Sequence, residues 1–141
     1  MAAATNIAAI IDQVLAQHLT YLNQRCLQDI SDAVRDADAK GLPGVIIEAG
    51  TALGGSAIVM ALSKAPERPM RAYDAFDMIP PPSDQDGEDV HKRYKKIKSG
   101  DSKGIGGDEY YGYRVDLLGE VTESFARFGA PAEKTNVQLI K

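Results

Sequence analysis

The sequence predicts an α/β protein built around a parallel sheet. Three short apolar runs, at residues 45–47, 70–76 and 137–140, alternate with segments whose apolar residues recur every three or four positions. Such spacing is typical of strands and of amphipathic helices, respectively. Strands that alternate with helices are joined by right-handed crossovers, which place the strands parallel in one sheet.

Two helices are predicted ahead of the sheet. Residues 5–19 carry isoleucine, leucine and valine at helical spacing, and Thr5 or Asn6 can cap the first turn. The pattern resumes at Tyr21 and continues to about Ala39 as a second helix. Lys40-Gly41-Leu42-Pro43 then provides a cation, a glycine and a proline in the order that ends helices. We therefore assign residues 1–40 to an N-terminal helical segment and residues 41–141 to the sheet domain.

The first strand leads into a glycine-rich turn. Residues 45–47 are a continuous β-branched run, which predicts a strand buried on both faces. The segment from Glu48 to Ser56 reads EAGTALGGS, and a helix is expected from Ser56 to Lys64. Glycines after a strand let a ligand approach the backbone, and helix-initial N–H groups point toward it. The alternative is a tight turn that only allows the helix to pack on the strand.

The second strand begins at Met70 and runs out at Asp74. A polar stretch follows at residues 77–108, with three consecutive prolines and one short helix expected at residues 88–98. This stretch is long for a loop inside a compact domain, so we interpret it as a functional segment or lid.

The last predicted elements close the fold. A helix is expected from Val115 to Phe128, where Gly129 and Pro131 end it. A third strand follows at residues 137–140.

The composition and net charge of the chain restrict its possible functions. The chain has 141 residues, of which 44% are hydrophobic and 26% charged, as in an ordinary globular domain. Its net charge of −4 argues against a general nucleic-acid binder. No apolar run approaches the roughly 20 residues of a membrane-spanning helix, so no membrane partner is expected. The single cysteine, Cys26, cannot form an internal disulfide, which fits a reducing, cytoplasmic setting.

The spacing of the glycines restricts the classes of ligand that the turn can bind. The dinucleotide motif G-x-G-x-x-G is absent, and the P-loop lysine is missing after Gly55. Asp74 ends the next strand, 26 residues after Glu48, where a carboxylate can accept hydrogen bonds from both ribose hydroxyls. Glu48 would repel a phosphate and attract a sulfonium or an ammonium. These residues predict a nucleoside ligand that carries little negative charge.

Two motifs resemble those of the macrocin O-methyltransferase (TylF-type) family, a class I S-adenosylmethionine-dependent methyltransferase family. The first is E-x-G-x-x-x-G-G-S at residues 48–56, and the second is D-x-F-x-x-x-P-P at residues 74–81. The resemblance extends from about Tyr21 to Lys141. It implies a Rossmann-like three-layer αβα fold, of which this chain would hold the first three parallel strands in the order 3-2-1.

The resemblance also implies a cofactor site and a reaction. S-adenosylmethionine would be bound by residues of the glycine turn and the following strand end: Glu48, Gly50, Thr51, Gly54, Gly55, Ser56, Asp74 and Phe76. A methyl group would pass to a hydroxyl of a sugar or other small metabolite. The family's acidic metal ligands, for Mg²⁺ or a similar ion, come from later strands, so no metal ligand is assigned in this chain and the catalytic residues stay unknown.

The missing strands suggest that this is the N-terminal portion of a longer enzyme. The strand at residues 45–47 would then be an exposed apolar edge, and such an edge favours pairing with another chain as a homo-oligomer. The alternative is a non-catalytic nucleoside-binding or oligomerising module derived from a methyltransferase.

Other chemically suggestive residues have simpler interpretations. The basic run around His91 is interpreted as a solvated helix face, and the acidic residues at 84–89 as a hydrated loop. His18 is interpreted as a packing or surface residue. The three tyrosines within residues 110–113 could line an acceptor pocket or pack the returning loop, and the sequence does not decide between the two.

Overall fold

A computed structural model describes residues 5–141 and shows the predicted parallel sheet. Its three strands are β1 (Ile46–Ala49), β2 (Met70–Tyr73) and β3 (Val137–Ile140), in the order β1-β2-β3. Both strand pairs are parallel. The α/β architecture and the strand order are therefore confirmed.

The helices follow the predicted order along the chain. They are α1 (Ile7–Ala16), α2 (Gln24–Ala39), α3 (Gly55–Ser63), α4 (Glu88–Lys98) and α5 (Leu117–Arg127), with short 3₁₀ turns η1 (Ile105–Gly107), η2 (Tyr111–Tyr113) and η3 (Ala132–Lys134). Asn6 caps α1, because its side chain accepts a hydrogen bond from the Ala9 N–H at 3.2 Å. Gly129, at φ +78°, follows the end of α5.

The second helix begins later than the sequence suggested. Asn23 caps α2 by accepting from the Cys26 N–H at 2.9 Å. The expected start at Tyr21 is wrong, since the Thr20 hydroxyl oxygen accepts from the Leu22 N–H and forms a local turn there. Residues 18–22 consequently form a link between α1 and α2, and this α1–α2 link forms one wall of a pocket.

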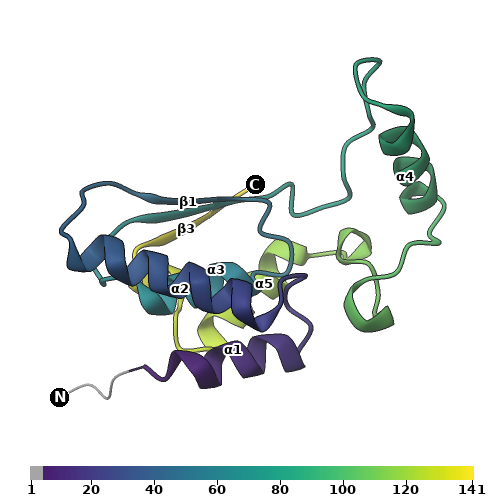
Figure 1. Cartoon of the computed structure of the whole chain (residues 1–141). Helices are drawn as coiled ribbons and strands as arrows, with labels where there is room; N and C mark the ends of the chain where they lie inside the picture. Colours follow the sequence, from purple (N-terminus) through teal and green to yellow (C-terminus); the bar gives the residue numbers. More distant parts are fainter. Residues whose placement is uncertain (1–4) are drawn as a thin grey trace.

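One face of the sheet packs against helices and the other is open. Met70 and Ala72 of β2 are buried, whereas Ile47 of β1 is 61% exposed and Tyr73 of β2 is 36% exposed. The expectation that the first strand is buried on both faces is therefore wrong. Both crossovers run in the same direction along the sheet, so right-handedness places α3 and α5 on the same side. Figure 1 shows α1, α2, α3 and α5 together on that side.

The core lies between this sheet face and the helices. Its largest fully buried side chains come from α1, α2, α3, α5 and β2: Ile11, Leu27, Ile58, Phe125 and Met70. The two N-terminal helices contribute to the same core as the sheet and pack against α3. The core thus fixes the position of α3, and with it the glycine turn that precedes it.

An ion pair fastens the end of α2 to the loop before β2. Arg68 donates through Nε to the Asp38 carboxylate and through Nη2 to the Leu42 carbonyl at 2.6 Å. The Ala65 N–H also donates to Asp38, at 2.6 Å, and together with Arg68 it holds the pKa of that carboxyl below its ordinary value. The two charged side chains are only 13% and 17% exposed, so this contact is a structural clasp.

The polar stretch between β2 and α5 projects from the body. It contains α4 at the predicted residues, and Figure 1 shows this helix standing apart from the sheet and its helices. Ile97 is the one buried residue of α4. The Tyr113 hydroxyl donates to the Ile97 carbonyl and accepts from the Ser102 N–H at 3.2 Å. The end of α4 is therefore fastened to η2.

Candidate functional site

The turn after β1 is hydrogen-bonded to the end of β2. Gly50 has φ +90°, which favours glycine, and its N–H donates to the Tyr73 carbonyl at 2.7 Å. The Thr51 N–H donates to the same carbonyl at 3.2 Å. A Cβ on Gly50 would meet nothing within 4 Å, so this part of the turn faces open space.

Asp74 braces the turn from the neighbouring strand. One carboxylate oxygen accepts from the Ala52 N–H at 2.8 Å, and the other accepts from the Phe76 N–H at 2.9 Å. Ala52 and Phe76 both have positive φ, +49° and +45°, a conformation that costs free energy in residues with side chains. Because each carboxylate oxygen has two lone-pair sites, Asp74 keeps acceptor capacity for a ligand hydroxyl.

Glu48 is the second carboxylate at the turn. It lies on the helix-covered face of β1, where the Ser56 hydroxyl of α3 donates to its Oε1. Its Oε2 is buried and has no hydrogen-bond partner within residues 5–141. Burial raises the pKa of Glu48, the Ser56 and Thr51 hydroxyls oppose this shift, and the Asp74 charge adds to it. A ligand cation or N–H donor reaching Oε2 would relieve this cost.

The three glycines of the turn have different roles. A Cβ on Gly54 would lie 2.9 Å from Val121 Cγ1, and a Cβ on Gly55 would lie 2.5 Å from the Leu19 carbonyl oxygen. The Gly55 N–H donates to that same carbonyl at 2.9 Å. Packing against α5 and the α1–α2 link therefore explains Gly54 and Gly55, and Gly50 is the glycine that faces open space.

A pocket of about 260 Å³ opens between the turn and the α1–α2 link. The wall from the turn consists of Glu48, Ala49, Gly50, Thr51, Ala52 and Ser56. The opposite wall is residues 19–22 of the link. This second wall was not predicted from the sequence because the helical spacing of apolar residues continues through Tyr21. Thr20, which forms a turn, and Asn23, which caps α2, were the local signals that could have revealed it.

The predicted site residues thus fall into two groups. Glu48, Gly50, Thr51 and Ser56 line the pocket, and Asp74 holds its rim through Ala52. Gly54 and Gly55 are buried behind it, and Phe76 is 3% exposed and belongs to the hydrophobic core.

Comparison with protein families identifies a model that matches most of the chain. The model of the macrocin-O-methyltransferase (TylF) family matches residues 11–105, more than half of the chain. The chain belongs to the macrocin O-methyltransferase (TylF) family. The matched residues include the glycine turn and Asp74, and they end before the tyrosines at 110–113. Comparison with curated proteins gave no match.

In this TylF-family chain, a tyrosine cluster lies near the glycine turn. The ring centroids of Tyr110 and Tyr111 are 4.6 Å apart, and that of Tyr111 is 6.3 Å from that of Tyr21, with the rings edge to face. Burial raises the pKa of Tyr111; a hydrogen bond with Tyr110 and the nearby Asp74 charge act in the same direction. The tyrosines of the returning loop therefore reach the α1–α2 link.

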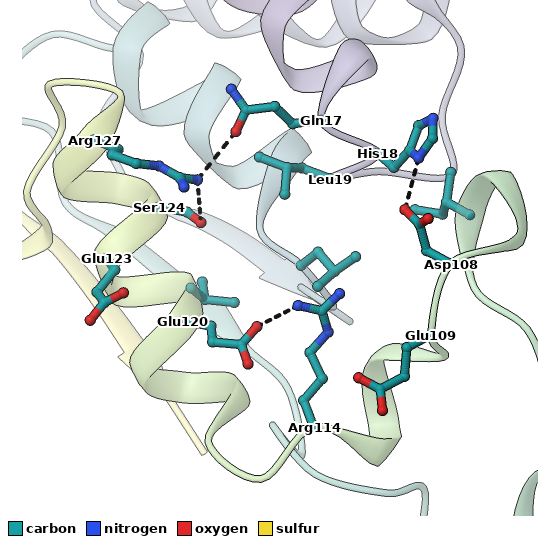
Figure 2. Close-up of a pocket in the computed structure, with 13 residues that line it drawn as sticks. Gln17, His18, Leu19, Asp108, Glu109, Arg114, Glu120, Glu123, Ser124 and Arg127 are labelled. Atoms are coloured by element: carbon teal, nitrogen blue, oxygen red, sulfur yellow. Dashed lines mark hydrogen bonds and ion pairs between the residues drawn. The ribbon is translucent and has the colours of Figure 1, made fainter. Parts of the chain in front are cut away.

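A second hollow, of about 240 Å³, lies on the other side of Leu19. Figure 2 shows its polar wall, in which His18 Nδ1 pairs with Asp108 at 2.8 Å and Arg114 pairs with Glu120 at 2.6 Å. His18 was interpreted as a packing or surface residue, and its ring does pack against the backbone of Gly106. Arg127 of α5 also donates to the side chain of Gln17, the C-cap of α1, at 3.2 Å. These contacts fasten the end of α1 to α5 and to the residue that follows η1.

Two further observations concern metal binding and membrane insertion. Among residues 5–141, no group of three or more His, Cys, Asp or Glu side chains is arranged to hold a metal ion. Within the same range, no helix is long and apolar enough to cross a membrane.

Proposed function

We propose that this TylF-family protein binds S-adenosylmethionine in the pocket at the glycine turn. The observation that carries the proposal is the convergence of Glu48 and Asp74 on one turn from neighbouring strands. Glu48 lines the pocket and keeps an unpartnered carboxylate oxygen, so its negative charge suits the ammonium group of the methionine part. Asp74 has the remaining lone pairs to accept from the ribose hydroxyls.

The reaction proposed is methyl transfer to an oxygen nucleophile, a hydroxyl of a sugar or other small metabolite. The bound cofactor supplies a methyl group on a positively charged sulfur. The described residues of this chain would bind and orient it, and positioning two reactants in line accounts for a large share of such catalysis. The absence of phosphate-binding features at the turn agrees with a ligand of this charge.

No residue of the described chain is assigned as the catalytic base. The family resemblance suggested a divalent metal, but the acidic side chains of residues 5–141 form no cluster that fits one, and no step is assigned to a metal here. We propose that the base comes from further strands of the same sheet or from a partner subunit. β1 is an edge strand at which further strands could pair, and the open sheet face, with Ile47 and Tyr73 exposed, favours association with a partner.

Isothermal titration calorimetry with S-adenosylhomocysteine tests the binding site. Asp74→Asn should weaken binding at least ten-fold, because it removes the ribose acceptor charge. Asp84→Asn, a matched change on the exposed loop, should leave the affinity unchanged. Unfolding curves for both variants control for the loss of the Ala52 contact. Wild-type affinity in a folded Asp74→Asn variant would refute the assignment.

The second candidate function is a non-catalytic nucleoside-binding or oligomerising module. The exposed apolar residues of the sheet face favour it, because they suit subunit contact in a homo-oligomer. Light scattering after size-exclusion chromatography measures the oligomeric state, and a radiolabelled methyl-transfer assay measures turnover. Cofactor binding by a dimer without turnover supports this second function, whereas turnover of any hydroxyl acceptor supports the first.

A further inference from the structure

Two tyrosines from distant parts of the chain meet beside the glycine-turn pocket. Tyr21, in the α1–α2 link, lines the pocket together with Glu48 and is 59% exposed. Tyr111, in η2, contacts Tyr21 edge to face, with ring planes at 69°. This contact joins the segment that covers the pocket to the segment that returns from α4.

The rest of the cluster holds Tyr111 in place. Tyr110 is buried, and its ring centroid lies 4.6 Å from Tyr111 and 5.2 Å from Tyr113. Tyr113 is itself fastened to the end of α4 through its hydroxyl. Tyr111 is half-buried, so its ring is preorganised, while the Tyr21 ring is exposed at the pocket.

The charge around these rings favours a cation. Aromatic faces carry a negative quadrupole that attracts positive groups. The cluster already holds one cation on its outer side, because the Arg93 guanidinium lies over the Tyr110 ring, 6.0 Å from its centroid, and its charge also reaches Tyr21. On the pocket side, the carboxylates of Glu48 and Asp74 add negative charge. A neutral sulfur would gain little from this environment.

We propose that the rings of Tyr21 and Tyr111 form an aromatic wall that binds the sulfonium of the cofactor and selects it over the neutral thioether of the product. This inference rests on the proposed function and adds a specificity determinant to it. Preference for the sulfonium form favours exchange of product for fresh methyl donor. The tyrosine hydroxyls are not required for this role, because the ring faces provide the attraction.

Calorimetric titration with two ligands tests the aromatic wall. S-adenosylmethionine and S-adenosylhomocysteine differ by one methyl group and one positive charge, so the ratio of their dissociation constants measures the contribution of the methylated, charged sulfur. In Tyr21→Leu, the preference for the charged ligand should fall about 3- to 30-fold. Tyr21→Phe should keep it. Tyr94→Leu, a matched change on α4 outside the cluster, should leave it unchanged.

A third ligand and a second position complete the test. An S-adenosylmethionine analogue with an amine-bearing carbon in place of the methylated sulfur is also a cation, so Tyr21→Leu should weaken its binding as it weakens that of S-adenosylmethionine. Tyr111→Leu should act in the same direction; thermal unfolding shows whether that half-buried position still folds. Because Tyr21 is exposed, its variants decide the outcome if Tyr111→Leu unfolds.

The outcomes separate this inference from the proposed function. If wild type binds both ligands and Tyr21→Leu weakens both equally, the aromatic wall is wrong and the pocket assignment stands. A Tyr21→Phe variant that loses the preference as Tyr21→Leu does would also overturn the wall. If folded wild type binds neither ligand, the proposed function and the wall fall together.

Discussion

Replacing Gly55 with alanine should destabilise the protein by disturbing the wall of the pocket. The new Cβ would lie 2.5 Å from the Leu19 carbonyl oxygen and 2.8 Å from Val14 Cγ1. Overpacking costs about 1–3 kcal/mol, and loss of the hydrogen bond from the Gly55 N–H to Leu19 adds about 0.5–1.5 kcal/mol. Alanine's better helix propensity returns about 0.5–1 kcal/mol. The net loss lies between about 0.5 and 4 kcal/mol with a central value of about 2 kcal/mol, which lowers Tm by roughly 8 °C.

Differential scanning calorimetry measures this loss, and Gly119→Ala is the control. Gly119 lies in the first turn of α5, and the atoms nearest to a Cβ there belong to the Asp116 side chain. That side chain can rotate away, so the cost should be limited to the helix cap, about 1 kcal/mol. A Gly55→Ala protein as stable as wild type would refute the close contact between Leu19 and α3. In a folded Gly55→Ala protein, affinity for S-adenosylhomocysteine should also fall, because Leu19 to Leu22 would move.

Three further changes test other contacts. Glu48→Gln should raise Tm at pH 7 and have less effect on Tm below pH 4.5, the ordinary pKa of Glu48. Burial in the folded state raises the pKa of this carboxyl, so the protein loses stability as the carboxyl ionises; an equal gain in Tm at both pH values would contradict this. Arg68→Ala should cost about 2 kcal/mol in urea unfolding, because it removes the charged hydrogen bonds that Arg68 donates to the half-buried Asp38 and to the Leu42 carbonyl, and a loss below about 0.5 kcal/mol would exclude the clasp. Tyr113→Phe should speed hydrogen exchange at the Ser102 amide with little change in Tm, because it removes the hydroxyl that accepts from this amide. Unchanged exchange would exclude the Ser102–Tyr113 hydrogen bond.

The strand–helix alternation was sufficient to predict the fold of the sheet region. The helix at residues 88–98 and the strand at residues 137–140 have the predicted bounds because charged flanks, glycines and a β-branched start mark them locally. The order of the strands was expected from the family resemblance, and crossover handedness then places both crossover helices on one side of the sheet.

The burial of β1 could not be predicted in the same way. Val45, Ile46 and Ile47 have similar hydrophobicity, but Ile46 faces the helices and Ile47 faces solvent. A continuous apolar run carries no period-2 signal, so it does not tell whether a second helical layer is present. The number of crossovers on each side of the sheet decides this, and that number is a property of the whole topology.

The site was only partly predictable. Glu48 and Asp74 were brought to the turn by strand order alone, as expected. The packing roles of Gly54 and Gly55 depend on Val121 and Leu19, which lie far away in sequence. The Tyr21–Tyr111 contact spans 90 positions, and no local pattern indicates it. Long-range packing therefore determined which predicted residues face the pocket and which are behind it.

The most direct test of the central claim is an amide chemical-shift titration of the isotope-labelled chain with S-adenosylhomocysteine. Binding between Glu48, Asp74 and the α1–α2 link predicts the largest shifts at Gly50, Thr51, Ala52 and Tyr21. Shifts confined to the second hollow around Gly106 and Asp108, or no shifts at saturating ligand, would contradict a nucleoside site at the glycine turn.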